Sequence, residues 1–414
     1  MASAVEHRIE TIEDVAPSTQ FMRPVRTNQR RRKKLLRRET KDSSQKLRLA
    51  TQAVFLTLNV WIGIQFYLWT RWAETGGRTT AVSRPAGVEG WLPIEGMMQF
   101  KYVVATGQLP RLHPAAFFLF VAFTLISLLF GKAFCGWICP VGTVSEGLWK
   151  IGRHLFGGSF RMARWIDLPL RSLKYLLLSF FVYAVAMMSA AAIADFVASP
   201  YGLVVDVRML NFFRFLSTTT AYVIATLVVA SLLVQNFWCR YLCPYGAFMG
   251  LISFFSPARI IRNENACIDC AQCAKACPSV LRVDRLVQIR SAECMSCLEC
   301  VAVCPAKNAL SLQFAGPTEM RRIVPAWQIA AGIAIIFFGL VGYAKFSDHW
   351  QTHLPQGGLL EAGADCQRAA SSHDRAESRV NSLKSIERHA VEQPYFPGTL
   401  PEHHRPDLAS NSAA

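Results

Sequence analysis

The sequence lacks the signatures of several common redox and nucleotide-binding proteins. It contains no C-x-x-C-H motif, and none of its 9 histidines lies inside a stretch long enough to span a membrane. Attached c-type haem and membrane haem with two histidine ligands are therefore not expected. No Walker loop is present and no G-x-G-x-x-G opens a βαβ unit, which argues against a built-in nucleotide or nicotinamide site. Any redox chemistry must depend on other centres.

Charged residues are also scarce. They make up 17% of the chain, whereas hydrophobic residues make up 52%, and this balance is typical of a membrane protein. The net charge of +16 is compatible with nucleic-acid binding, but twelve Lys and Arg lie between Arg23 and Arg48, directly before the first apolar stretch. That position is typical of membrane orientation. We expect the membrane as a partner and no nucleic acid.

Five apolar stretches approach the length of a membrane-spanning helix, which is about 20 residues. They lie near residues 49–70, 114–133, 173–195, 220–238 and 325–345. The second is the weakest because its uncharged part is short, and a buried helix is the alternative for it. A further apolar run, residues 246–255, is expected to form an interfacial or re-entrant helix. The predicted fold class is an α-helical integral membrane protein with about five transmembrane helices.

The basic residues before the first span predict the orientation of the chain. Segment 1–48 is expected to remain in the cytoplasm of a bacterial inner membrane, because it is polar and no cleavage site follows it. Alternation across five spans places the cysteine-rich segments in the cytoplasm and residues 346–414 in the periplasm. This polar tail is expected to be disordered, and Cys366 within it is expected to have no function of its own.

Two cysteine runs predict a small iron–sulfur domain of the bacterial ferredoxin type. Residues 267–278 and 294–305 both follow the C-x2-C-x2-C-x3-C-P pattern, in which the fourth cysteine binds the cluster of the other run. The expected ligands of the two 4Fe-4S clusters are Cys267, Cys270, Cys273 and Cys304 for one, and Cys294, Cys297, Cys300 and Cys277 for the other. Small residues such as Ala271 and Ser296 are expected to let backbone amides approach the sulfurs. Paired zinc knuckles are the alternative.

Two further motifs have C-x3-C-P spacing, one at Cys135 and Cys139 and one at Cys239 and Cys243. They follow the second and fourth predicted spans at equivalent positions. Residues four apart share one face of a helix, so each motif is expected to present two thiols side by side. Four thiols would suit a further cluster, a zinc or copper ion, redox-active dithiols or a docking surface. Simple packing of apolar cysteines is the remaining alternative, and the duplication favours a redox or metal role.

The combination of duplicated C-x3-C-P motifs with a double 4Fe-4S run resembles the NapH/NosR/CcoG class of membrane polyferredoxins. The likeness covers about residues 50–345 and includes the Phe134-Cys-Gly-Trp-Ile-Cys-Pro core. Members of the class donate electrons from quinol to periplasmic reductases, or reduce cytoplasmic copper during oxidase assembly. The sequence shows neither the flavin-binding domain of NosR-like proteins nor the immunoglobulin-like domain of CcoG-like proteins, so NapH-like proteins are the closest match.

These observations predict a domain order and a function. The expected segments are a basic segment 1–48, a four-span membrane domain 49–255, an α+β ferredoxin insert 256–318, a last transmembrane helix 325–345 and a polar tail 346–414. The resemblance implies electron transfer between the quinone pool and a reductase or other protein partner, as a component of an oxidoreductase system. The alternatives are a cytoplasmic copper(II) reductase and a docking or assembly protein with structural clusters.

Three ionisable residues in the predicted outer loops, Glu95, Lys101 and Asp206, are weaker candidates for a functional role. Charged groups near a membrane site often handle protons, which a quinol releases when it is oxidised. Solvated loop charges are the ordinary alternative.

Overall fold

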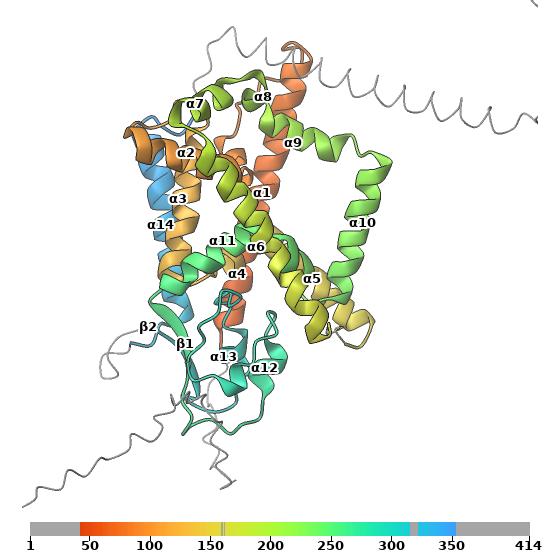
Figure 1. Ribbon diagram of the computed structural model, residues 1–414, viewed down its shortest axis with the longest axis vertical. Coiled ribbons are helices and arrows are strands. Elements are labelled where there is room, and N and C mark those ends of the chain that lie inside the picture. The colour runs from red at the N-terminus through yellow and green to blue at the C-terminus, as the bar shows by residue number, and fades with distance from the viewer. Residues whose placement is uncertain (1–41, 159, 161, 315–321, 353–414) are drawn as a thin grey trace, which may run out of the picture.

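The computed structural model describes residues 42–158, 160, 162–314 and 322–352. Most of segment 1–48, and the tail from residue 353 onward with Cys366, lie outside the described residues. Within them the protein is mostly helical, and the helical bundle carries a small α+β insert at one end (Figure 1). The predicted fold class, a helical membrane protein with a small α+β insert, is confirmed.

Among the described residues, three helices are long and apolar enough to cross a membrane. They are α1 (Ser44–Glu74), α6 (Arg164–Met187) and α14 (Ala326–Phe346). The pair α9 (Val205–Arg214) and α10 (Thr218–Leu233) counts as a fourth only if two helices bent by 83° form one broken span. The structure therefore supports three to four spans and does not confirm the predicted five.

Two of the predicted spans are short or interrupted. Helix α3 (Pro114–Phe130) has 17 residues, which corresponds to about 25 Å of helix against a hydrocarbon core of about 30 Å. It ends at Gly131, whose φ of 69° is left-handed. The predicted span 173–195 is broken at Ser189, whose side chain accepts a hydrogen bond from the Ala192 amide and caps α7 (Ala190–Ala198). Local capping therefore divides an apolar run that hydropathy alone joins.

The remaining helices are shorter and connect these elements. They are α2 (Pro93–Thr106), α4 (Ala133–Trp137), α5 (Pro140–Leu155), α8 (Pro200–Leu203), α11 (Pro244–Ile252), α12 (Gln272–Ala276) and α13 (Glu299–Ala302), with the 3-10 turns η1 (Ala86–Trp91), η3 (Ser253–Phe255) and η4 (Val283–Arg285) and the π-helical turn η2 (Trp238–Leu242). The apolar run 246–255 falls on α11 and η3 and is too short to cross a membrane.

One hydrophobic core extends from the helical bundle into the insert. It contains Ile126 of α3 and Ile333 of α14 together with Cys273, Cys300 and Leu312 of the insert. Helix α3 packs against both α2 and α14. Because the core is continuous, the insert is held in a fixed position against the helices.

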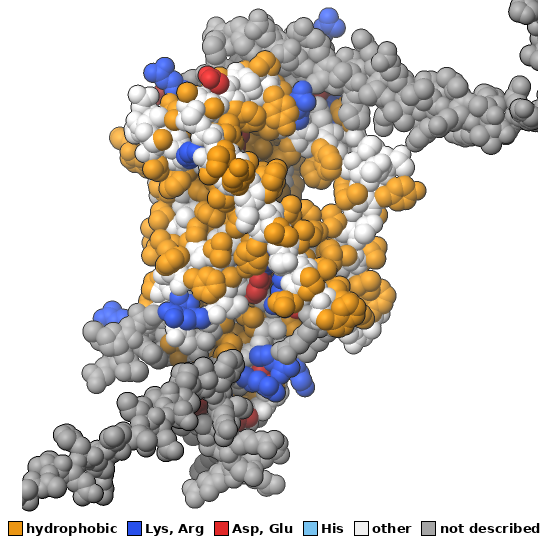
Figure 2. Space-filling model, in the orientation of Figure 1, with side chains coloured by type: hydrophobic (Ala, Val, Ile, Leu, Met, Phe, Trp, Pro, Cys, Tyr) orange, Lys and Arg blue, Asp and Glu red, His pale blue; other side chains and the backbone are white. Residues whose placement is uncertain are grey.

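The outer surface of the bundle is strongly apolar. Large exposed side chains include Trp61 of α1, Phe180 of α6, Tyr222 of α10 and Phe338 of α14. Figure 2 shows that hydrophobic side chains cover the middle of the molecule, while Lys and Arg gather toward its two ends. An apolar surface of this size is expected where a protein faces lipid.

A two-stranded sheet closes the insert. Strand β1 (Ala258–Arg262) pairs antiparallel with β2 (Leu310–Phe314), with Ala258 opposite Phe314 and Arg262 opposite Leu310. All five residues of β1 are buried. The pairing brings the start and the end of the cysteine-rich segment together, so that both runs lie within one closed loop.

Candidate iron-sulfur site

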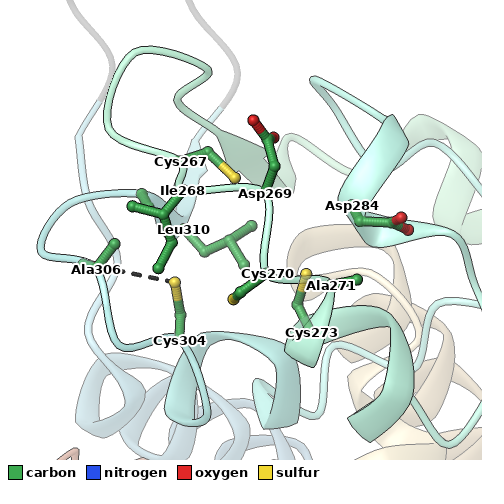
Figure 3. Close-up of a pocket in the computed structure, with 11 residues that line it drawn as sticks. Cys267, Ile268, Asp269, Cys270, Ala271, Cys273, Asp284, Cys304, Ala306 and Leu310 are labelled. Atoms are coloured by element: carbon green, nitrogen blue, oxygen red, sulfur yellow. Dashed lines mark hydrogen bonds between the residues drawn. The ribbon is translucent and has the colours of Figure 1, made fainter. Parts of the chain in front are cut away.

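The insert gathers the cysteines of the two runs around two cavities. The first cavity is lined by Cys267, Cys270, Cys273 and Cys304 (Figure 3). Three of these cysteines come from the first run, and Cys304 reaches the cavity from the end of the second. Apolar groups of Ile268 and Leu310 complete much of the lining. Asp269 and Asp284 also belong to the lining, and Cys270 lies at its exposed side.

The second cavity has the reciprocal composition. It is lined by Cys294, Cys297 and Cys300 of the second run and by Cys277 from the end of the first. The two cavities are neighbours, because α12, which carries Cys273, packs against α13, which carries Cys300. The grouping of the eight cysteines is the one that ligand exchange between the runs requires.

Left-handed backbone conformations shape both cysteine loops. Asp269 and Ala271, on either side of Cys270, have φ of 56° and 55°, and the equivalent Ser296 and Leu298 have φ of 49° and 58°. Alternation of left- and right-handed residues turns successive backbone amides inward and forms a concavity suited to anions. The branched Leu298 stands where the first run has alanine, so the loop depends on this conformation and not on small side chains.

Backbone amides contact several of the sulfurs. The Leu281 amide donates to the Cys277 sulfur at 3.5 Å, and the amides of Ala274 and Ser296 lie near the sulfurs of Cys273 and Cys294. Burial nevertheless raises the pKa of the Cys273 and Cys294 thiols to about 11. As free thiols they keep their protons at neutral pH, and binding a metal centre would replace those protons.

The cavities fit an iron–sulfur cluster better than a zinc ion. Among the described residues, no three His, Cys, Asp or Glu side chains are placed to hold a single metal ion. Zinc needs four ligands at about 2.0–2.3 Å from one point, whereas a cubane occupies the space between its cysteines. Four cysteines around one cavity, with amides directed at the sulfurs, suit a cubane that fills the cavity.

The loop of the second run packs directly on the first C-x3-C-P motif. A Cβ on Gly136 would lie 2.4 Å from the Met295 carbonyl oxygen, so only glycine permits this approach. The buried Trp137 donates its indole Nε1–H to the Ser296 carbonyl at 3.0 Å. The chain between Cys135 and Cys139 therefore contacts the chain between Cys294 and Cys297.

The structure brings the two C-x3-C-P motifs together, but not on continuous helices as predicted. Cys135 lies in α4 and Cys239 in η2, whereas Cys139 and Cys243 are the N-caps of α5 and α11. Pro140 and Pro244 explain the break, because proline is accommodated in the first turn of a helix and disrupts a helix interior. The charge environment of Cys139 includes the other three thiols, so all four lie close to one another.

Arg48 joins three parts of the molecule at this site. Its guanidinium forms two hydrogen bonds to the Glu146 carboxylate of α5, at 2.6 and 2.7 Å. It also contacts the Gly136 carbonyl oxygen at 3.2 Å and Glu299 of α13 at 3.3 Å. Sequence reasoning counted Arg48 only among the basic residues that orient the chain. No pattern in the sequence signals its partners, because they lie in distant segments.

Replacing Arg48 with Met should destabilise the protein by about 3 kcal/mol, because it leaves a buried carboxylate without its main partner. Burial favours the protonated form of Glu146, but Arg48 and Lys150 outweigh it and lower its pKa to about 2. A lowered pKa contributes stability that is complete above the ordinary value of 4.5 and is lost only as pH falls toward 2. Thermal unfolding in detergent should therefore show the same loss at pH 6 and pH 8.

The exposed Lys46 in the same helix provides the control for this experiment. Lys46→Met should change stability by less than about 0.5 kcal/mol. Equal losses in the two variants would show that Arg48 has no special structural role.

The three predicted ionisable residues lie at the opposite end of the molecule from the insert. Lys101 donates to the carbonyl oxygens of Val185 at 3.0 Å and Ala186 at 2.8 Å, and so satisfies the end of α6. Asp206 pairs with Arg84 at 2.8 Å, and Glu95 with the His113 side chain. The length of α3 separates them from the cysteines, and their contacts are internal to this end of the fold.

Comparisons with known proteins agree with this description. The chain matches the family described as a 4Fe-4S binding domain over residues 112–159 and 218–262, and the 4Fe-4S dicluster domain over residues 259–305. The first match contains both C-x3-C-P motifs, and the second contains both cysteine runs in full, with Pro305 as its last residue. No solved structure matches the chain.

Three curated relatives show how far the likeness extends. YccM of Escherichia coli (strain K12), named as a candidate electron transport protein, is 48% identical over 311 residues, which cover 75% of this chain and 87% of YccM. NirI of Paracoccus denitrificans is 28% identical over 236 residues, 55% of this chain and 33% of NirI. The regulatory protein NosR of Pseudomonas aeruginosa is 27% identical over 195 residues, 45% of this chain and 26% of NosR.

A bundle of apolar helices joined to 4Fe-4S binding domains defines a membrane polyferredoxin, a class of iron–sulfur electron-transfer proteins. The chain belongs to the NapH/NosR-type polyferredoxin membrane family, as the predicted resemblance indicated.

Proposed function

We propose that the protein relays electrons between the membrane quinol pool and a protein redox partner, with two 4Fe-4S clusters bound in the insert. The observation that carries this proposal is the pair of neighbouring cavities, each lined by four cysteines. Clusters of this kind accept and donate single electrons. Electron transfer in this family requires the membrane and a redox partner. Quinol dissolved in the membrane is the electron donor in this proposal.

The proposed ligands exchange between the two runs. Cys267, Cys270, Cys273 and Cys304 hold one cluster, and Cys294, Cys297, Cys300 and Cys277 hold the other. The reciprocal lining of the two cavities supports this assignment. Left-handed residues such as Ala271 and Leu298 direct backbone amides toward the sulfurs and so stabilise the thiolate ligands.

The position of the cavities supports an order for the relay. The second cavity belongs to the loop that packs on Gly136 and Trp137, so it is the one next to the membrane domain. Cys270 of the first cavity is exposed. A soluble partner would therefore meet the first cluster, and the membrane domain would exchange electrons with the second.

We place the protein in a bacterial inner membrane, with the insert in the cytoplasm and the C-terminal tail in the periplasm. Basic residues of the insert, among them Arg259, Arg262 and Arg290, support this orientation under the positive-inside rule. The cytoplasm is also the compartment in which thiols remain reduced and available to bind clusters.

The four C-x3-C-P cysteines form a further redox or metal site in this proposal. Their mutual proximity and their contact with the second run support the assignment. Such a site would lie between the membrane domain and the insert.

Iron and sulfide analysis tests the number of clusters. The protein purified without oxygen, with both Cys135 and Cys239 replaced by Ser, should retain about eight irons and eight acid-labile sulfides, as two cubanes require. Any excess in the unmodified protein then measures the content of the C-x3-C-P site. As the control, Cys300→Ser should lose iron from the insert. A preparation that contains zinc and no iron would contradict the proposal.

A further inference from the structure

A lysine is buried beside the C-x3-C-P cysteines without a carboxylate partner. Lys132 lies between α3 and α4 and is 3% exposed. Its Nζ lies 3.4 Å from the Ala292 carbonyl oxygen, and no described Asp or Glu comes within ion-pair distance of it. A buried ammonium is expensive unless negative charge lies nearby. Some other group must therefore supply that charge.

The surroundings of Lys132 identify the source. The ionisable groups that lie close enough to interact with its charge are Cys135, Glu293, Cys243 and Cys239. Three of these four are thiols of the C-x3-C-P set. Neutral thiols do not balance an ammonium, whereas thiolates that bind a metal centre do.

A second buried lysine adds to the positive charge. Lys174 of α6 is fully buried, and its Nζ lies 2.6 Å from the Glu293 carboxylate. Glu293 directly precedes Cys294, the first cysteine of the second cavity. Glu293 is therefore in ion-pair contact with Lys174 and not with Lys132, and the nearby Arg171 pairs with Asp167 at 2.6 Å. The region between the C-x3-C-P cysteines and the second cavity therefore carries an excess of positive charge.

We propose that Lys132 is the counter-cation of the centre held by the four C-x3-C-P cysteines, and that Lys132 and Glu293 set its reduction potential in opposite directions. This inference rests on the proposed electron relay. An iron–sulfur cluster is the centre considered, because the family model that covers both motifs is a 4Fe-4S binding domain, and such a centre is anionic because four thiolates outweigh the positive charge of its iron–sulfur core.

The direction of each effect follows from charge. Reduction adds one electron to a centre, so a nearby cation stabilises the reduced state and a nearby anion destabilises it. At a fixed ambient potential, Lys132→Met should lower the ratio of reduced to oxidised centre about tenfold, as expected for one unit charge about 10 Å away at an effective dielectric near 20. A tenfold change corresponds to 59 mV for a one-electron couple. Glu293→Gln should shift the potential upward.

The experiment is a redox titration of the full-length protein, purified in detergent without oxygen and followed by electron paramagnetic resonance. Cys135→Ser, Cys297→Ser and Cys270→Ser assign the signals of the three centres. The change in reduction potential caused by Lys132→Met should be largest for the centre whose signal Cys135→Ser removes. It should be smaller for the centre that Cys297→Ser removes, and smallest for the centre that Cys270→Ser removes. Lys132→Arg, which keeps the charge, should restore the original potential.

Lys345→Met is the matched control, because Lys345 is exposed at the far end of α14 and should leave every potential unchanged. If Lys132→Met does not fold, Glu293→Gln still tests the sign of the effect. The inference is wrong if no signal depends on Cys135, or if both charge changes leave the titration unaltered while the clusters remain reducible. If the wild-type protein has no reducible centre, the proposed function in electron transfer is wrong.

Discussion

Replacing Cys277 with Ser is expected to damage the centre held by Cys294, Cys297 and Cys300 while the centre of its own run keeps its signal. The reason is that Cys277 lines the cavity of the other run. Loss of one thiolate should convert that centre to a three-iron form or remove it. Electron paramagnetic resonance of the reduced and oxidised protein distinguishes these states. Cys304→Ser should have the reciprocal effect on the first centre.

Cys270→Ser and Cys297→Ser are the controls, because each replaces a middle cysteine within its own run. Cys277→Ser should lose the same centre as Cys297→Ser, and Cys304→Ser the same centre as Cys270→Ser. If Cys277→Ser and Cys270→Ser lose the same centre, each run holds its own cluster and the exchange is wrong.

Replacing Gly136 with Ala should slow electron transfer from the membrane domain to the insert. The added Cβ would lie 2.4 Å from the Met295 carbonyl oxygen, and backbone must move to relieve that contact. Any shift that lengthens the path between the two centres lowers the rate of electron transfer, and we expect a loss of several-fold. Stopped-flow reduction of the clusters by a soluble quinol analogue measures this rate.

Two comparisons isolate the effect of the contact. Dithionite should reduce the exposed first cluster of the variant at the normal rate, because it does not need the membrane domain. Gly147→Ala is the matched variant, since Gly147 lies in neighbouring α5 and its Cβ would meet nothing within 4 Å. Unchanged quinol reduction in Gly136→Ala would mean that electrons do not enter through this contact.

The cysteine spacing predicted the composition of the cavities because short-range geometry determines it. Three cysteines within seven residues must share one loop, and the fourth follows a short helix that leads away from that loop. The left-handed conformation of Leu298 was not predictable in the same way. A branched residue gives no local preference for that conformation, and the surrounding packing must impose it.

For the helical part, the sequence predicted the class of membrane protein correctly, but not the number and the limits of the spans. Hydropathy found the apolar stretches of α1, α6 and α14, because lipid-facing length is a property of local sequence. It did not predict the cap at Ser189 or the bend between α9 and α10. The contacts of Arg48 with Glu146 and of Lys132 with the Ala292 carbonyl join segments far apart in the chain, and no short sequence window contains both partners.

The reciprocal lining of the cavities also has a consequence for biosynthesis. During translation, the first cavity has only three of its cysteines until the chain has been made as far as Cys304. Strand β2 and then α14 follow Cys304 closely, and Ile329 and Ile333 of α14 belong to the same core as the cysteine loops. The second cavity has all four cysteines once the chain reaches Cys300, and the first once it reaches Cys304, so both sets are complete shortly before α14 is made. On the proposed ligand assignment, we therefore expect both clusters to be loaded late in synthesis, when the core residues of α14 are available to close the cavities.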